Sequence, residues 1–387
     1  MVIEIMNINK EYKKYIDSFP EPKDDFERSL FQYRCVTHFF NRKTENITIQ
    51  NIIGYVGIIS FGIVYLLNTA FICKKKNIVD AIFVNADSRE SGEYDYSGCF
   101  PEELKSEFKN IEYLHFKRYP SFLSGVIEAK ALKLWLGLVH RFPREGWLNF
   151  LCFVHLMSAA KITKKYEFKA LINYRLEFNV TSSLLTLYYE GCGKEHINFM
   201  HGDYIVDMRR AFVRFSRCYI FDEHYQKVFS WSRSPMNQFV VYTPPMYRIT
   251  VDNTIRPQYI TYFFSGEEGN LDAVKKILVK ISDKGYKCKV RMHPRYSNSR
   301  YIMSVFNDTD ICIEEPRSKS IKDSLNETRI AIGRRSTVLL QAYYMGKIVV
   351  IDDVSIPEIY DNMRYNMDIM VDKGHGILSE IEDMLLN

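Results

Sequence analysis

The chain has 387 residues, of which 47% are hydrophobic and 26% are charged, so it can bury a large core and is not a disordered chain. Its length predicts two domains. The net charge of +5 is small and evenly spread, which argues against a nucleic-acid partner and is compatible with anionic substrates or an acidic membrane surface. The eight cysteines form no C-x-x-C pair, as expected for reduced thiols in a cytoplasmic protein rather than for a zinc site.

Residues 1–48 are charged and helix-prone, with breaks at Pro20 and Pro22. We expect them to form an N-terminal helical leader or cap that precedes the first domain. Their mixed polar character predicts no signal peptide.

The apolar stretch from Ile52 to Cys73 is followed by three lysines and has two interpretations. It is about long enough to span a bilayer, and it has a basic flank. The same residues can instead form a strand at 51–56, a glycine-punctuated turn at 57–62 and a helix at 63–76. Three glycines and Ser60 favour the second interpretation. We therefore expect a soluble domain in which Ser60 and Gly62 follow a strand, on the acceptor side of a cleft.

Strand and helix patterns alternate from residue 51 onwards, beginning with the strand expected at 51–56. In the first half we expect helices over 132–162 and 181–189, and strands at 80–85, 111–115, 169–173, 196–200 and 217–221. The segment 232–257 contains four prolines and no helical periodicity, so it is interpreted as the connection between domains. In the second half we expect strands at 258–264, 287–292, 310–313, 329–332 and 348–352, and helices at 271–284, 321–327, 336–345 and 376–386.

This strict alternation predicts parallel sheets with helices on both faces. The fold class is therefore α/β, with two Rossmann-like, doubly wound domains at 49–245 and 246–387. We expect the carboxyl ends of their strands to face a shared cleft, because that is where open parallel sheets bind ligands.

The stretch that ends at His293-Pro294 is the first candidate binding segment. It reads Lys-Val-Arg-Met-His-Pro-Arg from residue 289, which is a buried strand that stops abruptly at a proline. His293 can donate a hydrogen bond to a phosphate or ribose oxygen, although a lone histidine at a strand end is often only a satisfied polar cap. Arg291 and Arg295 beside it favour an anionic ligand.

A second strand ends at Gly333 and is followed by Arg334, Arg335, Ser336 and Thr337. Either hydroxyl residue can cap the next helix, which is the plain structural interpretation. The functional interpretation is that the hydroxyls and the first N–H groups of that helix face a phosphate. Two arginines before a helix start oppose its dipole unless an anion is bound, so we favour the functional interpretation.

A candidate general base follows a strand of the first domain, in the sequence His201-Gly-Asp203-Tyr204. An Asp or His at a strand end can take a proton from a hydroxyl nucleophile. The alternative is a glycine turn with Asp203 as an Asx cap. We place Asp203 and His201 in the catalytic role and Tyr204 on the acceptor side.

Several weaker signals complete the candidate set. Glycine-rich and acidic strand ends can approach a phosphate or hold a ribose hydroxyl, and they place Ser265, Gly266, Glu314 and Glu315 on the donor side. Asp308-Thr-Asp310 is a D-x-D sequence, but it begins a strand instead of following one, so no metal site is expected. Neither a P-loop nor a G-x-G-x-x-G motif is present.

The pattern resembles bacterial sialyltransferases of the two-domain GT-B architecture, which include capsule polysialyltransferases and lipooligosaccharide sialyltransferases. Gly202-Asp203, His293-Pro294 and Ser336-Thr337 stand in the same order as the short motifs of that family. The resemblance implies inverting, metal-independent transfer from a CMP-linked sugar, with Asp203 as base and with His293, Ser336 and Thr337 on the CMP phosphate.

Two departures from that pattern matter. The family's acidic residue usually precedes the glycine, whereas here Asp203 follows it, so the base could be His201 oriented by Asp203. Arg334 and Arg335 replace small residues before the Ser motif, and we expect them to contact the donor's carboxylate or phosphate.

The resemblance implies a transferase that moves a nonulosonic acid (sialic, pseudaminic or legionaminic) or Kdo from CMP to a hydroxyl of a growing capsule or lipopolysaccharide glycan. No cofactor is expected beyond the CMP-sugar substrate. The acceptor would be a glycan or lipid-linked glycan, and the enzyme would act in the cytoplasm or peripherally on the inner face of the plasma membrane. Alternatives are another nucleotide donor (nucleotide hexose or CDP-alditol) and a non-catalytic, membrane-docked assembly partner, suggested by the aromatic stretch from Trp135 to Trp147.

Overall fold

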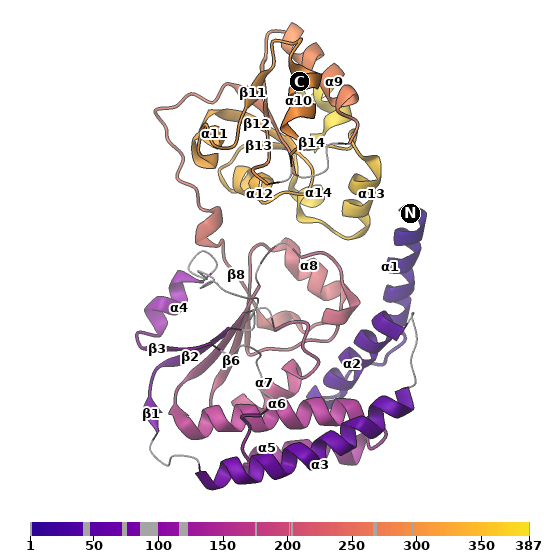
Figure 1. Cartoon of the computed structure of the whole chain (residues 1–387), viewed down its shortest axis with the longest axis vertical. Helices are drawn as coiled ribbons and strands as arrows, with labels where there is room; N and C mark the ends of the chain where they lie inside the picture. Colours follow the sequence, from indigo (N-terminus) through magenta and orange to yellow (C-terminus); the bar gives the residue numbers. More distant parts are fainter. Residues whose placement is uncertain are drawn as a thin grey trace. The chain divides into compact units, whose positions relative to one another are not determined.

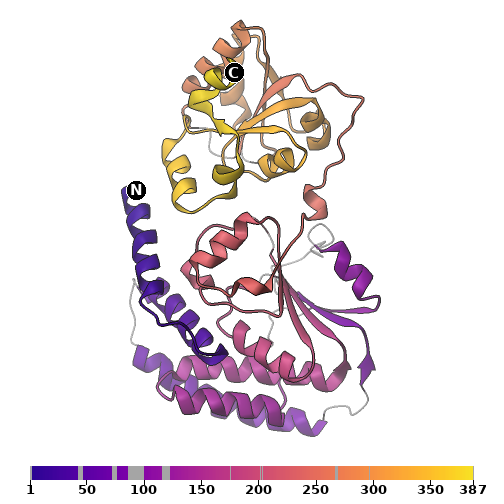
Figure 2. The same ribbon diagram turned by 180° about the vertical axis from the view of Figure 1, so that it is seen from behind.

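The computed structural model describes residues 2–41, 47–71, 76–85, 100–115, 123–174, 176–200, 202, 204–265, 269–295 and 297–386. The chain divides into two α/β units (Figures 1 and 2). The N-terminal unit comprises Glu11–Gly202 and Val206–Tyr242. The C-terminal unit comprises Thr243–Asn387 with the short segments Met1–Lys10 and Asp203–Ile205.

A six-stranded parallel sheet forms the centre of the N-terminal unit, in the order β3-β2-β5-β6-β7-β8. The five strands predicted from residue 80 onwards are confirmed to within one residue at each end. The sixth, β8, lies in the proline-rich segment that we interpreted as a linker, so that part of the interpretation was wrong. The strands are β2 (Ala81–Asn85), β3 (Ile111–His115), β5 (Ala170–Tyr174), β6 (Glu195–Phe199), β7 (Arg217–Ile220) and β8 (Phe239–Val241); β1 (Asn77–Ile78) pairs separately with β4 (Tyr166–Glu167).

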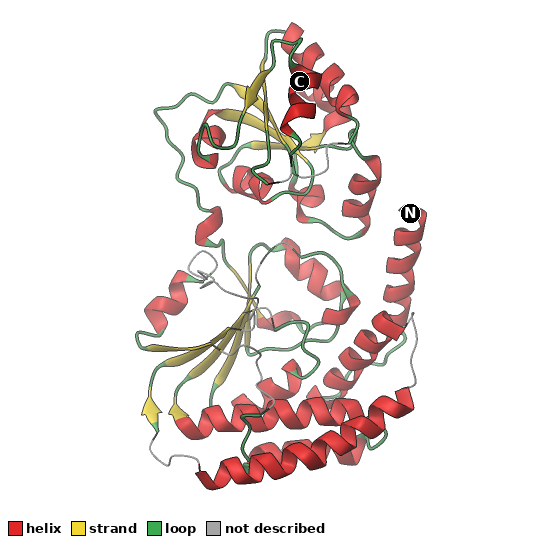
Figure 3. Cartoon of the chain, viewed as in Figure 1, coloured by secondary structure: helices red, strands yellow, loops and turns green. Residues whose placement is uncertain are grey.

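Helices cover this sheet (Figure 3). One of them, α6 (Gly146–Lys165), has 14 buried residues among its 20. It packs on α3 (Ile47–Phe71), α5 (Ala129–Arg141) and α7 (Ser182–Gly191). The single helix predicted over 132–162 is two helices, because Pro143 interrupts the pattern between α5 and α6. The other helices of this half are α1 (Val2–Asp17), α2 (Asp25–Asn41), α4 (Glu102–Glu107) and α8 (His224–Trp231).

The segment 47–71 is one continuous helix of 25 residues, α3, so the predicted strand at 51–56 and turn at 57–62 were wrong. Its glycines serve packing. A Cβ on Gly54 would lie 2.6 Å from the carbonyl carbon of Gly146 and 2.8 Å from the backbone nitrogen of Trp147. Ser60 is in mid-helix and donates to the Val56 carbonyl at 3.0 Å. Neither Ser60 nor Gly62 therefore lies at a strand end.

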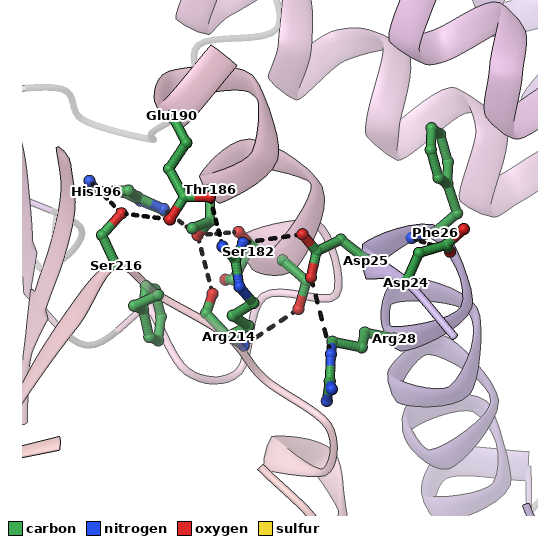
Figure 4. Close-up of polar contacts among 12 residues, drawn as sticks. Asp24, Asp25, Phe26, Arg28, Ser182, Thr186, Glu190, His196, Arg214 and Ser216 are labelled. Carbon is green, nitrogen blue, oxygen red and sulfur yellow. Dashed lines mark hydrogen bonds and ion pairs between the residues drawn. The ribbon is translucent and has the colours of Figure 1, made fainter. Parts of the chain in front are cut away.

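A polar network that extends from buried Asp25 to the surface fastens α2 to the rest of the N-terminal unit (Figure 4). Arg214 pairs with Asp25 at 2.8 Å and also with Glu190 on α7. Ser216 donates to Glu190 at 3.0 Å. Burial raises the pKa of Asp25 to about 6, although the charges of Arg214 and Arg28 oppose that rise. The acidic start of α2 is therefore held in a largely dry environment.

His196 is a structural histidine in the same region. It is fully buried, and its two ring nitrogens lie 2.7 Å from Thr186 Oγ1 and 2.7 Å from Asn173 Nδ2. Burial lowers the pKa of His196 to about 3, so the ring is neutral. Both ring nitrogens are used within the core, which leaves His196 no position for catalysis.

The C-terminal unit also has a six-stranded parallel sheet, in the order β11-β10-β9-β12-β13-β14. The chain starts at the central strand β9, adds β10 and β11 on one side, and then returns to add β12, β13 and β14 on the other. The switch point of this doubly wound sheet therefore lies between β9 and β12. The strands are β9 (Tyr259–Phe263), β10 (Lys287–Arg291), β11 (Cys312–Glu314), β12 (Thr328–Gly333), β13 (Ile348–Ile351) and β14 (Gly376–Ile377).

The two parallel sheets confirm the predicted α/β class with two doubly wound cores. The predicted closing helix at 376–386 is only partly right, because its first residues form β14. The helices α10, α13 and α14 were not predicted. Those of the C-terminal unit are α9 (Leu271–Asp283), α10 (Ser299–Phe306), α11 (Ile321–Glu327), α12 (Thr337–Tyr344), α13 (Pro357–Tyr365), α14 (Ile369–Lys373) and α15 (Ile381–Leu386).

Candidate functional site

A cavity of about 330 Å³ lies within the C-terminal unit, at the carboxyl ends of β9, β10 and β12. This is the switch point of the sheet, where doubly wound folds bind ligands. The structure brings together five of the residues predicted for the donor side and adds three others. The lining residues are Ser265, His293, Arg335, Ser336, Thr337, Leu340, Asp368 and Met370.

His293 follows β10, and two local hydrogen bonds orient it. Its backbone N–H donates to Ser297 Oγ at 2.7 Å, and its Nδ1 accepts from the backbone N–H of Arg295 at 3.1 Å. Partial burial, together with the positive charge of Arg295, lowers the pKa of His293, so the ring is neutral at pH 7. Because Nδ1 accepts a hydrogen bond, the proton of the neutral ring is on Nε2. The ring therefore offers an uncharged N–H donor.

The N-terminus of α12 supplies a second set of donors. Ser336 is its N-cap, and its Oγ accepts from the backbone N–H of Val338 at 3.3 Å. Because Ser336 Oγ accepts this hydrogen bond, its own O–H proton points away from Val338 and can be donated to another group. Thr337 adds a second hydroxyl at the first helical position. The first N–H groups of a helix carry partial positive charge and attract anions. Ser336 therefore caps α12 and also lies at the helix start where we predicted an anion to bind.

Arg335 and Asp368 form an ion pair in the cavity wall, with Arg335 Nε 3.4 Å from an Asp368 carboxylate oxygen. Arg335 is 45% exposed, whereas the side chain of Asp368 is 1% exposed. The same carboxylate caps α14 by accepting from the backbone N–H of Met370 at 2.9 Å. Asp368 was missed in the sequence, where only its position before a short helical stretch marked it as a cap.

The neighbouring Arg334 does not line the cavity. It is 2% exposed, and its Nε and Nη1 have no hydrogen-bond partner among the described residues. Gly333 is also outside the lining, and its small size serves strand packing, because a Cβ there would lie 2.9 Å from the Phe263 carbonyl oxygen. Of the two arginines, only Arg335 therefore lines the cavity, and its contact with a ligand stays a prediction.

Arg291 and Glu314 belong to a different cluster, beneath the edge of the sheet. Arg291 and Lys289 both pair with Glu314, the latter at 2.7 Å, and all three side chains are buried. Burial of Glu314 favours its neutral form, but hydrogen bonds from Lys289, Ser324 and Arg291 outweigh burial and lower its pKa. These residues stabilise the β10–β11 edge and do not line the cavity. Pro294, Arg295 and Glu315 are exposed and also lie outside the lining.

The catalytic candidates of the first domain cannot be placed. His201 and Asp203 lie outside the described residues, as does the donor-side candidate Gly266. Tyr204 is described, and its side chain is 1% exposed. Within the described part of the chain, no group of three or more His, Cys, Asp or Glu side chains is arranged to hold a metal ion.

No protein-family model and no curated protein matches this chain. It is similar to a solved structure of the wall teichoic acid polymerase TagF, with a TM-score of 0.39 and 11% identity over 94% of this chain and 88% of that chain. It is also similar to the glycotransferase of kitacinnamycin, with a TM-score of 0.42, 8% identity and coverage of 80% and 90%. A third similar structure is the UDP-GlcNAc 2-epimerase from Methanocaldococcus jannaschii, with a TM-score of 0.40, 10% identity and coverage of 79% and 91%. Values this low assign no family, donor or substrate to this chain.

Proposed function

We propose that the chain is a glycosyltransferase of GT-B architecture that binds the phosphate of a nucleotide sugar in the cavity of the C-terminal unit. The observation that carries this proposal is the convergence of His293, Arg335 and the capped start of α12 at the switch point of the sheet. An uncharged N–H, a guanidinium and a helix N-terminus can all donate hydrogen bonds to a phosphate. They come from two segments, because His293 follows β10 whereas Arg335 and the start of α12 are adjacent in the connection after β12.

Each group has a distinct task when the sugar leaves its nucleotide. The acceptor oxygen attacks the anomeric carbon, the bond from that carbon to the phosphate oxygen breaks, and its electron pair remains on the phosphate. Arg335 and the start of α12 stabilise the charge that develops there. His293 Nε2–H adds a hydrogen bond without adding charge. The acceptor proton passes to a base, for which the sequence offers Asp203 or His201.

The donor we favour is a CMP-linked nonulosonic acid or Kdo, and the acceptor is a hydroxyl of a capsule or lipopolysaccharide glycan. Two features support a single phosphate. The cavity is small, at about 330 Å³, and Arg335 is its only cation among the lining residues named above. A diphosphate would place two adjacent phosphate charges beside one guanidinium that is already paired with Asp368, whereas the second charge of a CMP-linked nonulosonic acid is on the sugar carboxylate.

A nucleotide panel tests the binding step. Thermal unfolding should be measured with CMP, a CMP-sugar, UDP, UDP-GlcNAc and CDP-glycerol, since a ligand that binds only the folded state raises Tm. We expect CMP and the CMP-sugar to stabilise the chain and the other nucleotides to have little effect. Arg335→Met should remove the shift. Arg300→Met is the matched control, because Arg300 is exposed on α10 and outside the lining.

Three outcomes separate the alternatives. Stabilisation by UDP-GlcNAc or CDP-glycerol, but not CMP, keeps a transferase and rejects the CMP donor. Stabilisation that survives Arg335→Met rejects this cavity as the site. If no nucleotide binds, the chain is not a nucleotide-sugar transferase, and a non-catalytic role replaces the proposal. CMP release with and without acceptor glycans then tests the reaction itself.

A further inference from the structure

One face of α3 is apolar and exposed along its whole length. Its exposed large side chains recur at intervals of three or four residues, so they form one stripe on the helix. A helix of 25 residues is roughly 37 Å long, and α3 contains no Asp, Glu, Lys or Arg. The stripe consists of Ile49, Ile52, Ile53, Val56, Ile59, Ile63, Leu66, Leu67 and Phe71, which are between 53% and 85% exposed.

The opposite face of α3 is built into the N-terminal unit. Tyr65 is fully buried, and its ring centroid lies 5.5 Å from that of Phe153 on α6. Asn68 Nδ2 donates to the carbonyl oxygens of Leu123 and Gly125 at 3.0 Å each. Thr69 Oγ1 accepts from the backbone N–H of Ile127 at 2.8 Å. The polar groups of the helix are thus used on the inner side, and the outer side is left aliphatic.

Helix α5 lies antiparallel beside α3 and has a different outer surface. Gly125, just before α5, packs against Tyr65, and Pro143, just after it, accepts a hydrogen bond from Tyr55. Figures 1 and 2, which view the chain from opposite sides, show both helices packed against α6. Five of the eight exposed residues of α5 and of the turn that follows it are basic; the eight are Ala129, Lys130, Lys133, Leu136, His140, Arg141, Pro143 and Arg144.

A cavity of about 710 Å³ at the C-terminal end of α3 adds to this positive charge. Its wall contains Thr69 and Ala70 of α3, four lysines and two glutamates, which leaves a surplus of two positive charges (4 − 2). Lys164 donates to a backbone carbonyl rather than to a carboxylate, at 3.0 Å. The lysines are Lys76, Lys130, Lys164 and Lys194.

We propose that the α3 stripe, defined by the nine residues above, seats the N-terminal unit on an anionic lipid bilayer. The helix would lie in the plane of the interface, with its stripe among the acyl chains and the basic residues of α5 at the level of the lipid phosphates. Apolar side chains flanked by cations are the usual composition of such interfacial helices. This inference is independent of the proposed function.

Charge decides between a bilayer and a second copy of the chain. In a symmetric dimer through the stripe, the same surface of each copy meets the other. Among the cations of α5 and of the turn after it, Arg141 is already paired with Asp24, but Lys130, Lys133 and Arg144 would then approach their own copies. A bilayer that contains acidic lipids has the opposite charge at the required position.

Packing decides between lying in the plane and spanning the bilayer. To span, α3 would have to leave α6, which would expose Tyr65 and break the bonds of Asn68 and Thr69. It would also open the close contact of Gly54 with the α6 backbone. The rings of Trp135 and Trp147 are half-buried, and Trp135 donates to a backbone carbonyl at 3.0 Å, so the membrane surface is α3 and not the stretch predicted from the tryptophans.

The test is co-sedimentation of the full-length protein with vesicles of phosphatidylcholine, with and without phosphatidylglycerol. We expect binding to the acidic vesicles that weakens as salt is raised. Ile59→Glu/Ile63→Glu should weaken it by at least about tenfold. The control is Tyr301→Glu/Leu386→Glu, which adds the same charge at exposed apolar side chains of the C-terminal unit. Circular dichroism and Tm should show that both variants fold.

Each result supports or overturns the proposal. Binding lost only in the α3 variant, together with release of bound protein by alkaline carbonate, supports an in-plane helix. Retention after carbonate overturns the in-plane position. Equal binding by the α3 variant shows that another surface docks. If no vesicle binds the chain, the proposal fails, and sedimentation equilibrium then shows whether the stripe joins two copies instead.

Discussion

Two glycines of α3 should respond oppositely to the same substitution. At Gly54 a Cβ would lie 2.6 and 2.8 Å from backbone atoms of α6, whereas at Gly62 the nearest atom would be the tip of Phe153 at 3.9 Å. Backbone cannot move aside as a flexible side chain can, so Gly54→Ala forces the two helices apart. Gly62→Ala meets only an ordinary contact.

The magnitude follows from two terms. Replacing glycine by alanine within a helix stabilises by about 0.5–1 kcal/mol in either position. This term cancels between the two variants. What remains at Gly54 is the overpacking penalty, which is typically about 1–3 kcal/mol. We therefore expect Gly62→Ala to be slightly more stable than the natural protein and Gly54→Ala to be less stable.

The assay is thermal and urea unfolding in buffer without lipid or detergent. For a unit of this size, each 1 kcal/mol changes Tm by roughly 2–4 °C, so the two variants should be separable. Circular dichroism should show unchanged helix content in both. Equal stability of the two variants would refute the close packing of α3 on α6, and with it the reason for expecting α3 to stay in the plane of a membrane.

Three further results should follow from the structure. Burial raises the pKa of Asp25 to about 6, above its value in the unfolded chain. The stability that Asp25 contributes is therefore present near pH 4 and is lost as the pH rises through 6. Urea unfolding at several pH values should show that the free energy of unfolding falls by about 3 kcal/mol over this range, and the Asp25→Asn variant should not show this fall. Ser336→Ala and Ser320→Ala each remove an N-cap and should each destabilise the protein by about 0.5–2 kcal/mol. Only Ser336→Ala should also weaken nucleotide binding, measured by calorimetry. An equal loss of nucleotide affinity in both variants would refute the site. Glu314→Gln removes the carboxylate that buried Lys289 and Arg291 share, so that Lys289 keeps only Glu327 at 3.4 Å. It should lower the free energy of unfolding by about 3 kcal/mol, and a much smaller change would show that the cluster is hydrated.

The second half of the chain was predictable because its strands end abruptly. Ile330 to Gly333 is a buried run that stops at a glycine, and Ser336 marks the helix start, so both the strand and the cap could be placed. Asp368 could not be placed, because it enters the cavity from the short connection between α13 and α14. No local pattern shows which loop will return to the strand ends.

The α3 segment was predicted wrongly for a physical reason. Glycine marks turns, but it also allows two helices to approach closely, and sequence alone does not separate these uses. Here Gly54 has the second use, and its partner Gly146 is almost a hundred residues away. Strand β8 was missed for a similar reason, because three apolar residues among prolines carry little signal until β7 is there to pair with them.

The pairing of Arg335 with Asp368 keeps the cavity near electrical neutrality before any anion enters. Because His293 is also uncharged, an incoming phosphate meets a guanidinium that already has a partner. The binding free energy of the phosphate is therefore the difference between its ion pair with Arg335 and the Arg335–Asp368 pair that it weakens. Asp368 is almost fully buried, so its charge remains costly without Arg335 beside it. A carboxylate that pairs again with its arginine limits how long any anion stays bound, which would suit the proposed transferase, since its site has to release a nucleotide after each reaction.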